Sequence, residues 1–292
     1  MTLLTECYLG FGAMAALYVL GSPRVAEPLY RPLMFEPTKY PKGFYNEPEL
    51  KQFLADNNAQ DVFIPIGNGK NLHAWHFINS RAAQTIMVCH GNEGNISDMS
   101  KLIQLLLHTG SSVFIFDYQG YGVSDGSPSI KGVCQDALIA YDWLVKKQRL
   151  DPKSIVLYGE SMGASIACWL IKQRTIGGII LQSASTNIRR IAHETFPPLG
   201  CFPYFLFPSP YFDNIAALRI KPYPLLIIHG SKDRTVVPAH AKNIFAAARE
   251  PKRIALLPYT AHEEIDNRDV GYFCQAVGEF LNSIKPVAIT QR

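Results

Sequence analysis

The sequence predicts an α/β fold with a mostly parallel central sheet, helices on both faces, an antiparallel hairpin at its N-terminal side and a small cap insertion. Short, continuously apolar runs alternate with helical segments, which is typical of parallel strands buried on both faces. Two strand-like runs around a turn at residues 67–70 precede that alternation and predict the hairpin. A stretch rich in proline and aromatic residues, at about 184–218, interrupts the alternation and predicts the cap.

Size and composition limit the classes of protein that this chain can represent. Its 292 residues, 48% hydrophobic and 18% charged, suffice for a large core. The net charge is +4, and Lys and Arg are scattered rather than gathered in a basic stripe, which argues against a nucleic-acid partner. The six cysteines are widely separated without a C-x-x-C pair, and four lie in apolar runs. This pattern favours free thiols in a reducing compartment over a disulfide scaffold.

Residues 1–22 form a hydrophobic segment, apolar throughout from Leu9 to Gly21. Its length lies between that of a signal-peptide core and that of a short membrane span. No Lys or Arg precedes the apolar run, and several follow it: Arg24, Arg31, Lys39 and Lys42. By the positive-inside tendency we predict an uncleaved membrane anchor with the rest of the chain on the cytoplasmic side. The alternatives are a signal peptide cleaved after residue 21, giving a secreted or periplasmic protein, and a helix docked on the domain.

The remaining elements are expected in a simple order. Residues 23–60, where prolines and aromatics alternate without periodicity, predict an extended linker and lead-in. The main domain is predicted at 61–286, with a tail at 287–292. Its hairpin strands are expected at 61–66 and 72–78, and its buried strands at 85–89, 112–116, 154–158, 178–181, 225–228 and 253–257. Helices are expected at about 96–109, 131–148, 162–174, 238–249 and 269–284.

A reactive serine is indicated by Gly159-Glu160-Ser161-Met162-Gly163, which lies between an apolar strand-like run and a helix-like run. Strand, sharp turn and helix with a serine at the apex is the arrangement of a nucleophile elbow. Glycines two residues to either side fit it, because a Cβ there would meet the backbone. The five-residue pattern alone also occurs by chance, so the partners of Ser161 decide its meaning.

Those partners occur in the order that such a serine requires: an acid and then a histidine, each after a later strand. Asp233 follows the strand at 225–228, and His262 follows the strand that ends at 257. The base takes the serine proton, and the acid orients the base. Asp213 is the second candidate for the acid, ranked lower because it follows no strand. The other seven histidines are interpreted as structural.

Two backbone N–H groups are predicted to form an oxyanion hole, which stabilises the tetrahedral oxyanion of acyl transfer. One belongs to Met162, directly after the nucleophile. The other belongs to Asn92 in the loop 90–95, where Gly91 provides the turn and lies against the substrate. A phosphate-binding interpretation of this loop is poor, because no G-K-[ST] follows.

The cap is expected at the edge of the sheet where ligands bind, with Phe196, Phe205 and Phe207 contacting substrate. The alternative is an irregular crossover whose aromatics complete the core. No metal set is found: Glu263 and Glu264 follow His262, but no second histidine lies at a useful helical spacing, so the pair is interpreted as solvated charge. No cofactor is predicted.

Taken together, these motifs resemble the α/β-hydrolase family over roughly residues 60–284. The landmarks are HGNEGN at 90–95, FDYQGYGVSDGSP at 116–128, GESMG at 159–163, the segment 229–238 and the His262 loop. In that family a D-x-x-G-x-G-x-S loop packs under the site, and it is matched here by Asp117, Gly120, Gly122 and Ser124. With DNI at 213–215, the combination is similar to the ABHD-type membrane-associated hydrolases, which include protein depalmitoylases.

The resemblance implies a serine hydrolase that cleaves an acyl ester or thioester next to a membrane. Depalmitoylases of that type carry a cysteine-rich N-terminus, whereas this chain has only Cys7 there, so a lipid or other acyl ester is favoured. An aminopeptidase-like peptidase is an alternative, for which Glu194 and Asp213 are the available acidic anchors. A non-catalytic binding module on the same fold is another, although such a module needs no triad.

Overall fold

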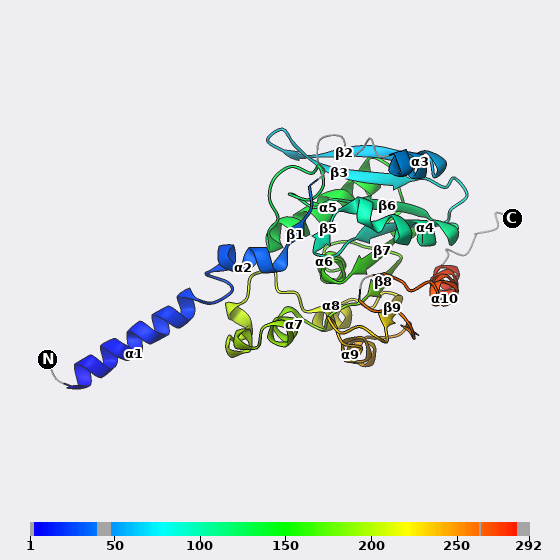
Figure 1. Ribbon diagram of the computed structural model, residues 1–292. Coiled ribbons are helices and arrows are strands. Elements are labelled where there is room, and N and C mark those ends of the chain that lie inside the picture. The colour runs from blue at the N-terminus through cyan, green and yellow to red at the C-terminus, as the bar shows by residue number, and fades with distance from the viewer. Residues whose placement is uncertain (1–2, 40–47, 263, 285–292) are drawn as a thin grey trace.

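The computed structural model describes residues 3–39, 48–262 and 264–284, and its centre is an eight-stranded sheet (Figure 1). The strands lie in the order β10-β9-β8-β7-β4-β6-β3-β2. Their bounds are β2 Ala59–Gly67, β3 Lys70–Phe77, β4 Thr85–Cys89, β6 Ser112–Phe116, β7 Ile155–Glu160, β8 Gly178–Gln182, β9 Leu225–Gly230 and β10 Lys252–Leu257. The pairs β2–β3 and β3–β6 are antiparallel, and the other pairs are parallel. The predicted fold class, including its leading hairpin, is confirmed.

Helices cover both faces of this sheet (Figure 1). One face packs on α5 (Ile130–Lys146), α6 (Met162–Leu170), α8 (Asn214–Ile220) and α9 (Ala239–Ala247). The other packs on α4 (Ser100–His108), which follows a 3-10 turn at Ile96–Met99, and on α10 (Val270–Ser283). Successive residues of β7 point to opposite faces, so Ile155 and Leu157 enter one core cluster while Val156 and Tyr158 enter the other. Burial on both faces explains why the strands are apolar throughout.

The interval between β8 and β9 is irregular, as its prolines require. It contains α7 (Ile188–Thr195) and two 3-10 turns, at Pro197–Cys201 and Tyr204–Leu206, before α8. Several of its aromatic side chains are buried in the core: Phe202, Phe207 and Phe212. For these residues the alternative interpretation, in which the aromatics complete the core, is correct.

The segment 23–60 differs from the extended linker that was predicted. It forms α2 (Glu27–Met34), the two-residue strand β1 (Glu36–Pro37) and α3 (Pro48–Asp56), and residues 40–47 lie outside the described part of the chain. Proline is tolerated in the first turn of a helix because the N–H groups there have no intrahelical partner. Prolines at the start of α2 and α3 are therefore compatible with helix. The predicted tail 287–292 and Glu263 also lie outside the described residues.

Helix α1 (Leu3–Leu20) occupies most of the predicted anchor and projects from the domain (Figure 1). Among the residues that the structure describes, no helix combines the length and apolarity needed to cross a membrane. The C-terminal end of α1 is attached to the cap. The Tyr18 ring stacks on Phe202 with centroids 4.9 Å apart, and the Tyr18 hydroxyl donates to the Cys201 carbonyl at 2.6 Å.

Candidate functional site

Ser161 occupies a sharp turn between β7 and α6, with φ +51° and ψ −113°. This backbone is strained for a non-glycine residue. Its neighbours are correspondingly crowded: a Cβ on Gly159 would lie 2.5 Å from the Ala164 Cα, and one on Gly163 would lie 1.9 Å from the Cys89 carbonyl oxygen. The geometry of the turn is therefore that of a nucleophile elbow, and the two glycines are present for the steric reason inferred from the sequence.

The structure brings the predicted nucleophile, base and acid into one hydrogen-bonded chain. The Ser161 Oγ lies 3.1 Å from the His262 Nε2, and the His262 Nδ1 lies 2.8 Å from the Asp233 Oδ2. Asp233 and His262 come from the loops after β9 and β10, which pair in parallel and therefore end at the same edge of the sheet as β7. The order along the chain and the strand-end positions used for the prediction account for this proximity.

Asp233 is buried and fixed by several donors. Its Oδ1 accepts the backbone N–H groups of Thr235 at 2.9 Å and Val236 at 2.8 Å. Burial alone would raise the pKa of Asp233, but interactions with His229 and His262 and the Val236 N–H outweigh it and hold that pKa below its usual range. Asp233 is therefore ionised at neutral pH and can accept the Nδ1 proton of His262.

His229, interpreted from the sequence as structural, contacts the acid. Its Nε2 lies 3.3 Å from the Asp233 Oδ2 and 2.6 Å from the Val236 carbonyl oxygen. The ring thus ties the acid to its own loop. Its position at the end of a buried strand is the signal in the sequence, because that position places the ring near the site.

The two other acidic candidates are engaged elsewhere. Asp213 caps α8, and its Oδ1 accepts the Ala216 N–H at 2.9 Å. Glu194 accepts from His240 at 2.6 Å and from Arg190 at 2.8 Å. Both carboxylates therefore have partners within the cap and its junction with the domain.

The loop after β4 lies against Ser161, where the second oxyanion donor is predicted. A Cβ on Gly91 would lie 3.9 Å from the Ser161 Cβ. The Met162 N–H begins α6 and, like other first-turn N–H groups, has no acceptor within the helix. The Gly91 carbonyl oxygen lies 3.0 Å from the His90 Nδ1. Because the peptide between Gly91 and Asn92 is trans, the Asn92 N–H points in the direction opposite to that carbonyl. Burial lowers the pKa of His90, so the ring is neutral and donates from Nδ1.

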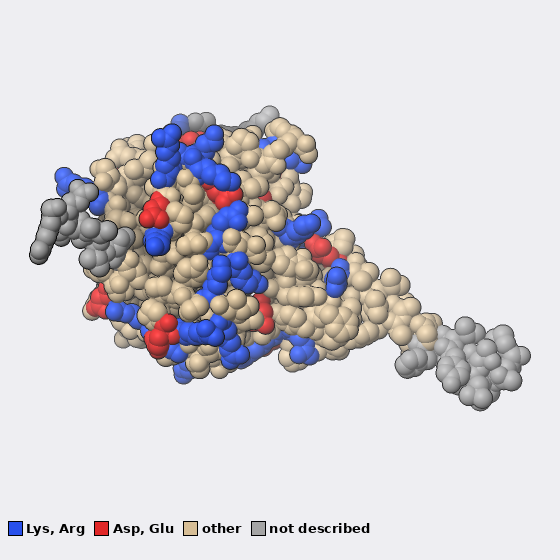
Figure 2. Space-filling view, turned by 180° about the vertical axis from the view of Figure 1, so that it is seen from behind, with Lys and Arg blue, Asp and Glu red and all other residues tan. Residues whose placement is uncertain are grey.

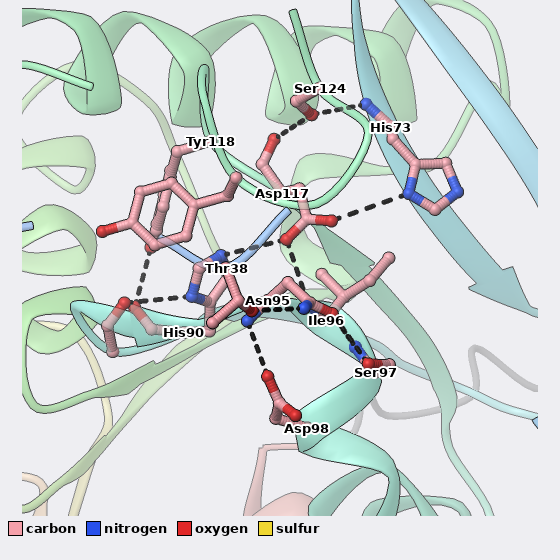
Figure 3. Close-up of polar contacts among 12 residues, drawn as sticks. Thr38, His73, His90, Asn95, Ile96, Ser97, Asp98, Asp117, Tyr118 and Ser124 are labelled. Carbon is pink, nitrogen blue, oxygen red and sulfur yellow. Dashed lines mark hydrogen bonds and ion pairs between the residues drawn. The ribbon is translucent and has the colours of Figure 1, made fainter. Parts of the chain in front are cut away.

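A buried polar cluster supports this loop from the side of the sheet (Figure 3). The Asp117 Oδ1 accepts the Ile96 N–H at 3.0 Å, and the Asp117 Oδ2 lies 3.7 Å from the His73 Nδ1. The Ser124 Oγ donates to the Asp117 carbonyl at 2.8 Å. The Tyr118 hydroxyl donates to the His90 carbonyl at 3.0 Å. The D-x-x-G-x-G-x-S loop thus packs under the site, as the resemblance implied.

The aromatic residues predicted to contact substrate have different environments. Phe207 has 2% of its surface exposed and packs in the core, so its side chain is not presented to a ligand, contrary to the prediction. Phe196 and Phe205 are exposed on the cap, at 52% and 61%, and their role in substrate binding stays a prediction. No group of three or more potential metal ligands occurs among the described residues.

Comparison with known proteins gives concordant matches. The family described as "Serine aminopeptidase, S33" matches residues 80–202. An uncharacterized protein of Mycobacterium tuberculosis is 32% identical over 76% of this chain and 79% of its own length. The alpha/beta hydrolase domain-containing protein WAV2 of Arabidopsis thaliana is 31% identical over 66% of this chain and 68% of its own. The esterase Pf2001 of Pyrococcus furiosus superposes with a TM-score of 0.68 at 19% identity, covering 87% of this chain and 99% of that structure.

Proposed function

The chain belongs to the α/β-hydrolase family, and on that premise we propose that it is a serine hydrolase of acyl esters or thioesters. The observation that carries the proposal is the chain of contacts from Ser161 through His262 to Asp233, at 3.1 and 2.8 Å. A non-catalytic module would need none of these three groups. The exposed aromatics of the cap support a lipid-like acyl substrate.

In the proposed reaction, His262 accepts the Ser161 proton as the Oγ attacks the substrate carbonyl. The Met162 and Asn92 N–H groups then stabilise the tetrahedral oxyanion. His262 returns the proton to the leaving alcohol or thiol, which leaves an acyl-enzyme on Ser161. Water attacks that ester, again with His262 as base, and the acid product departs. Ionised Asp233 stabilises the imidazolium during both steps.

A fluorophosphonate probe tests this proposal directly. Because the probe phosphonylates an activated serine, we expect one adduct per chain, mapped by peptide mass spectrometry to Ser161. Ser165, one turn along α6 and hydrogen-bonded to Asn214 at 3.1 Å, is the internal control and is expected to stay unmodified. An unlabelled chain, or an adduct on another residue, would rule out the assignment.

A peptidase is the second candidate, because the matching family is described as serine aminopeptidases. An aminopeptidase needs an acidic anchor for the substrate amine, and Glu194 and Asp213 already have partners. We therefore expect p-nitrophenyl esters of increasing acyl length to be hydrolysed in preference to aminoacyl p-nitroanilides. Equal or faster turnover of the anilides would favour the peptidase.

We also propose that α1 associates with a membrane surface, with the catalytic domain on the cytoplasmic side. The described end of α1 exposes Met14, Leu17 and Leu20, each at 60% or more, and Figure 2 shows mostly uncharged side chains on the part of the projecting helix that is not grey. Burial of such apolar side chains at a bilayer interface stabilises binding.

The full chain is expected to float with phospholipid vesicles, and a Leu17→Glu, Leu20→Glu double variant is expected to lose most of this binding. Ile78→Glu, at another exposed apolar position, is the control. Equal flotation of the double variant would contradict the proposal.

A further inference from the structure

We propose that residues 36–38 position Asn92 for catalysis by holding the outer side of the loop 92–95. The inference rests on the proposed hydrolase function. It extends that function to residues 23–39, called the N-terminal arm below, which lie outside the predicted domain. These residues act through their backbone and the Thr38 hydroxyl, so they are positioning residues rather than catalytic ones.

Strand β1 pairs in parallel with β5 (Glu93–Gly94), which is part of that loop (Figure 1). The Glu36 N–H donates to the Asn92 carbonyl at 2.9 Å, and the Thr38 N–H donates to the Gly94 carbonyl at 3.0 Å. The Asn95 Nδ2 donates to the Thr38 Oγ1 at 2.6 Å, a contact drawn in Figure 3. Three hydrogen bonds therefore join Glu36 and Thr38 to the loop, one from Glu36 and two at Thr38.

The opposite side of the loop is held by the domain itself. The Tyr121 hydroxyl donates to the Asn92 carbonyl at 2.6 Å, so this oxygen has one partner from the domain and one from the arm. The Asn95 Oδ1 accepts the Ser97 N–H at 2.9 Å and caps the following turn. Removing the Glu36 N–H leaves Asn92 held from one side only. An oxyanion donor that can shift loses part of its stabilisation of the transition state.

The N-terminal arm is itself attached to the domain, so it can hold the loop 92–95 in place. Phe35, directly before the strap 36–38, is 4% exposed and belongs to the core. The Thr38 carbonyl accepts the Gly122 N–H at 2.9 Å, which ties the strap to the loop under the site. Further back, the Arg24 N–H donates to the Leu206 carbonyl of the cap at 2.8 Å. The arm therefore contacts the cap at one end and the oxyanion loop at the other.

Glu36→Pro in the full chain is the direct test, because it deletes the N–H while the preceding Phe35 already has the extended φ and ψ that proline favours. Against a p-nitrophenyl ester we expect kcat to fall about 10-fold with KM unchanged, since loss of a whole oxyanion donor costs roughly 10² to 10³. The Ki of a trifluoromethyl ketone, which forms a tetrahedral oxyanion on serine, is expected to rise by a similar factor. A variant that only lowers the amount of folded protein would reduce the apparent kcat without raising the Ki of the ketone.

The matched control is Glu36→Ala, which keeps the N–H and is expected to retain the wild-type kcat. Thr38→Val, which removes the acceptor for Asn95, is a second variant with an expected smaller loss of kcat, and Thr38→Ser is expected to restore it. Wild-type rates in both Glu36→Pro and Thr38→Val would overturn the inference while leaving the hydrolase assignment intact. An inactive, unlabelled wild type would instead refute the proposed function itself.

Discussion

Replacing Ser161 with alanine is expected to lower kcat for ester hydrolysis by on the order of 10⁶-fold, because the proposed acyl-enzyme forms on the Ser161 hydroxyl. Alanine occupies the same strained turn without adding bulk, so the fold is expected to persist. Steady-state rates on a p-nitrophenyl ester, with circular dichroism to verify folding, would measure the effect.

The control for this variant is Ser165→Ala. It removes a hydroxyl from the same helix, where the Asn214 Nδ2 donates to it at 3.1 Å, and we expect kcat to stay within about threefold of wild type since it touches no reacting group. If Ser161→Ala retained more than about a hundredth of the wild-type rate, another nucleophile would have to be sought.

Asp233→Asn is expected to reduce kcat by about 10⁴-fold while keeping the shape of the site. The Thr235 and Val236 N–H groups require an acceptor at the present Oδ1 position, so the new amide turns its NH₂ toward His262. The His262 Nδ1 then accepts rather than donates, and its proton moves to Nε2. In that tautomer the ring cannot take the Ser161 proton. Rates measured from pH 6 to 9 would report the loss.

Asp213→Asn is the matched control, and it also tests the second candidate for the acid. Asparagine caps a helix as well as aspartate does, so α8 is expected to keep its N-terminal hydrogen bond to Ala216. A wild-type kcat for this variant beside an inactive Asp233→Asn would assign the acid. The reverse result would transfer the role to Asp213.

Much of the fold could be predicted because local sequence and burial agree in the central sheet. The bounds of β4 and β6 coincide with the predicted runs, and β7 to β10 differ by at most two residues at either end. Continuous apolar runs of that length are stable only where both faces are covered. The elbow could be predicted for a similarly local reason, since the steric demand of Ser161 falls on glycines two residues away.

The pairing of β1 and the contact between His229 and Asp233 could not be predicted, because each depends on how a segment without regular structure folds back on the domain. Strand β1 has two residues and exists through its pairing with β5, more than fifty positions later. No periodicity can be read from so short an element. His229 reaches Asp233 because the intervening loop turns back on the strand end. Phe207 was misplaced because aromatic content alone does not distinguish a cap that faces ligand from one that completes the core.

If residues 36–38 position Asn92 as proposed, the pairing of β1 with β5 also sets where a recombinant protein for kinetic work has to begin. A chain shortened to start at Pro48 would keep Ser161, Asp233 and His262 but lose the buried Phe35 and every donor that the strap gives to the loop 92–95. On the proposed role of the strap, ester hydrolysis by such a fragment is expected to be slower than by the full chain. The smallest unit suited to kinetic work therefore begins upstream of Phe35, about 25 residues before the predicted domain boundary at residue 61.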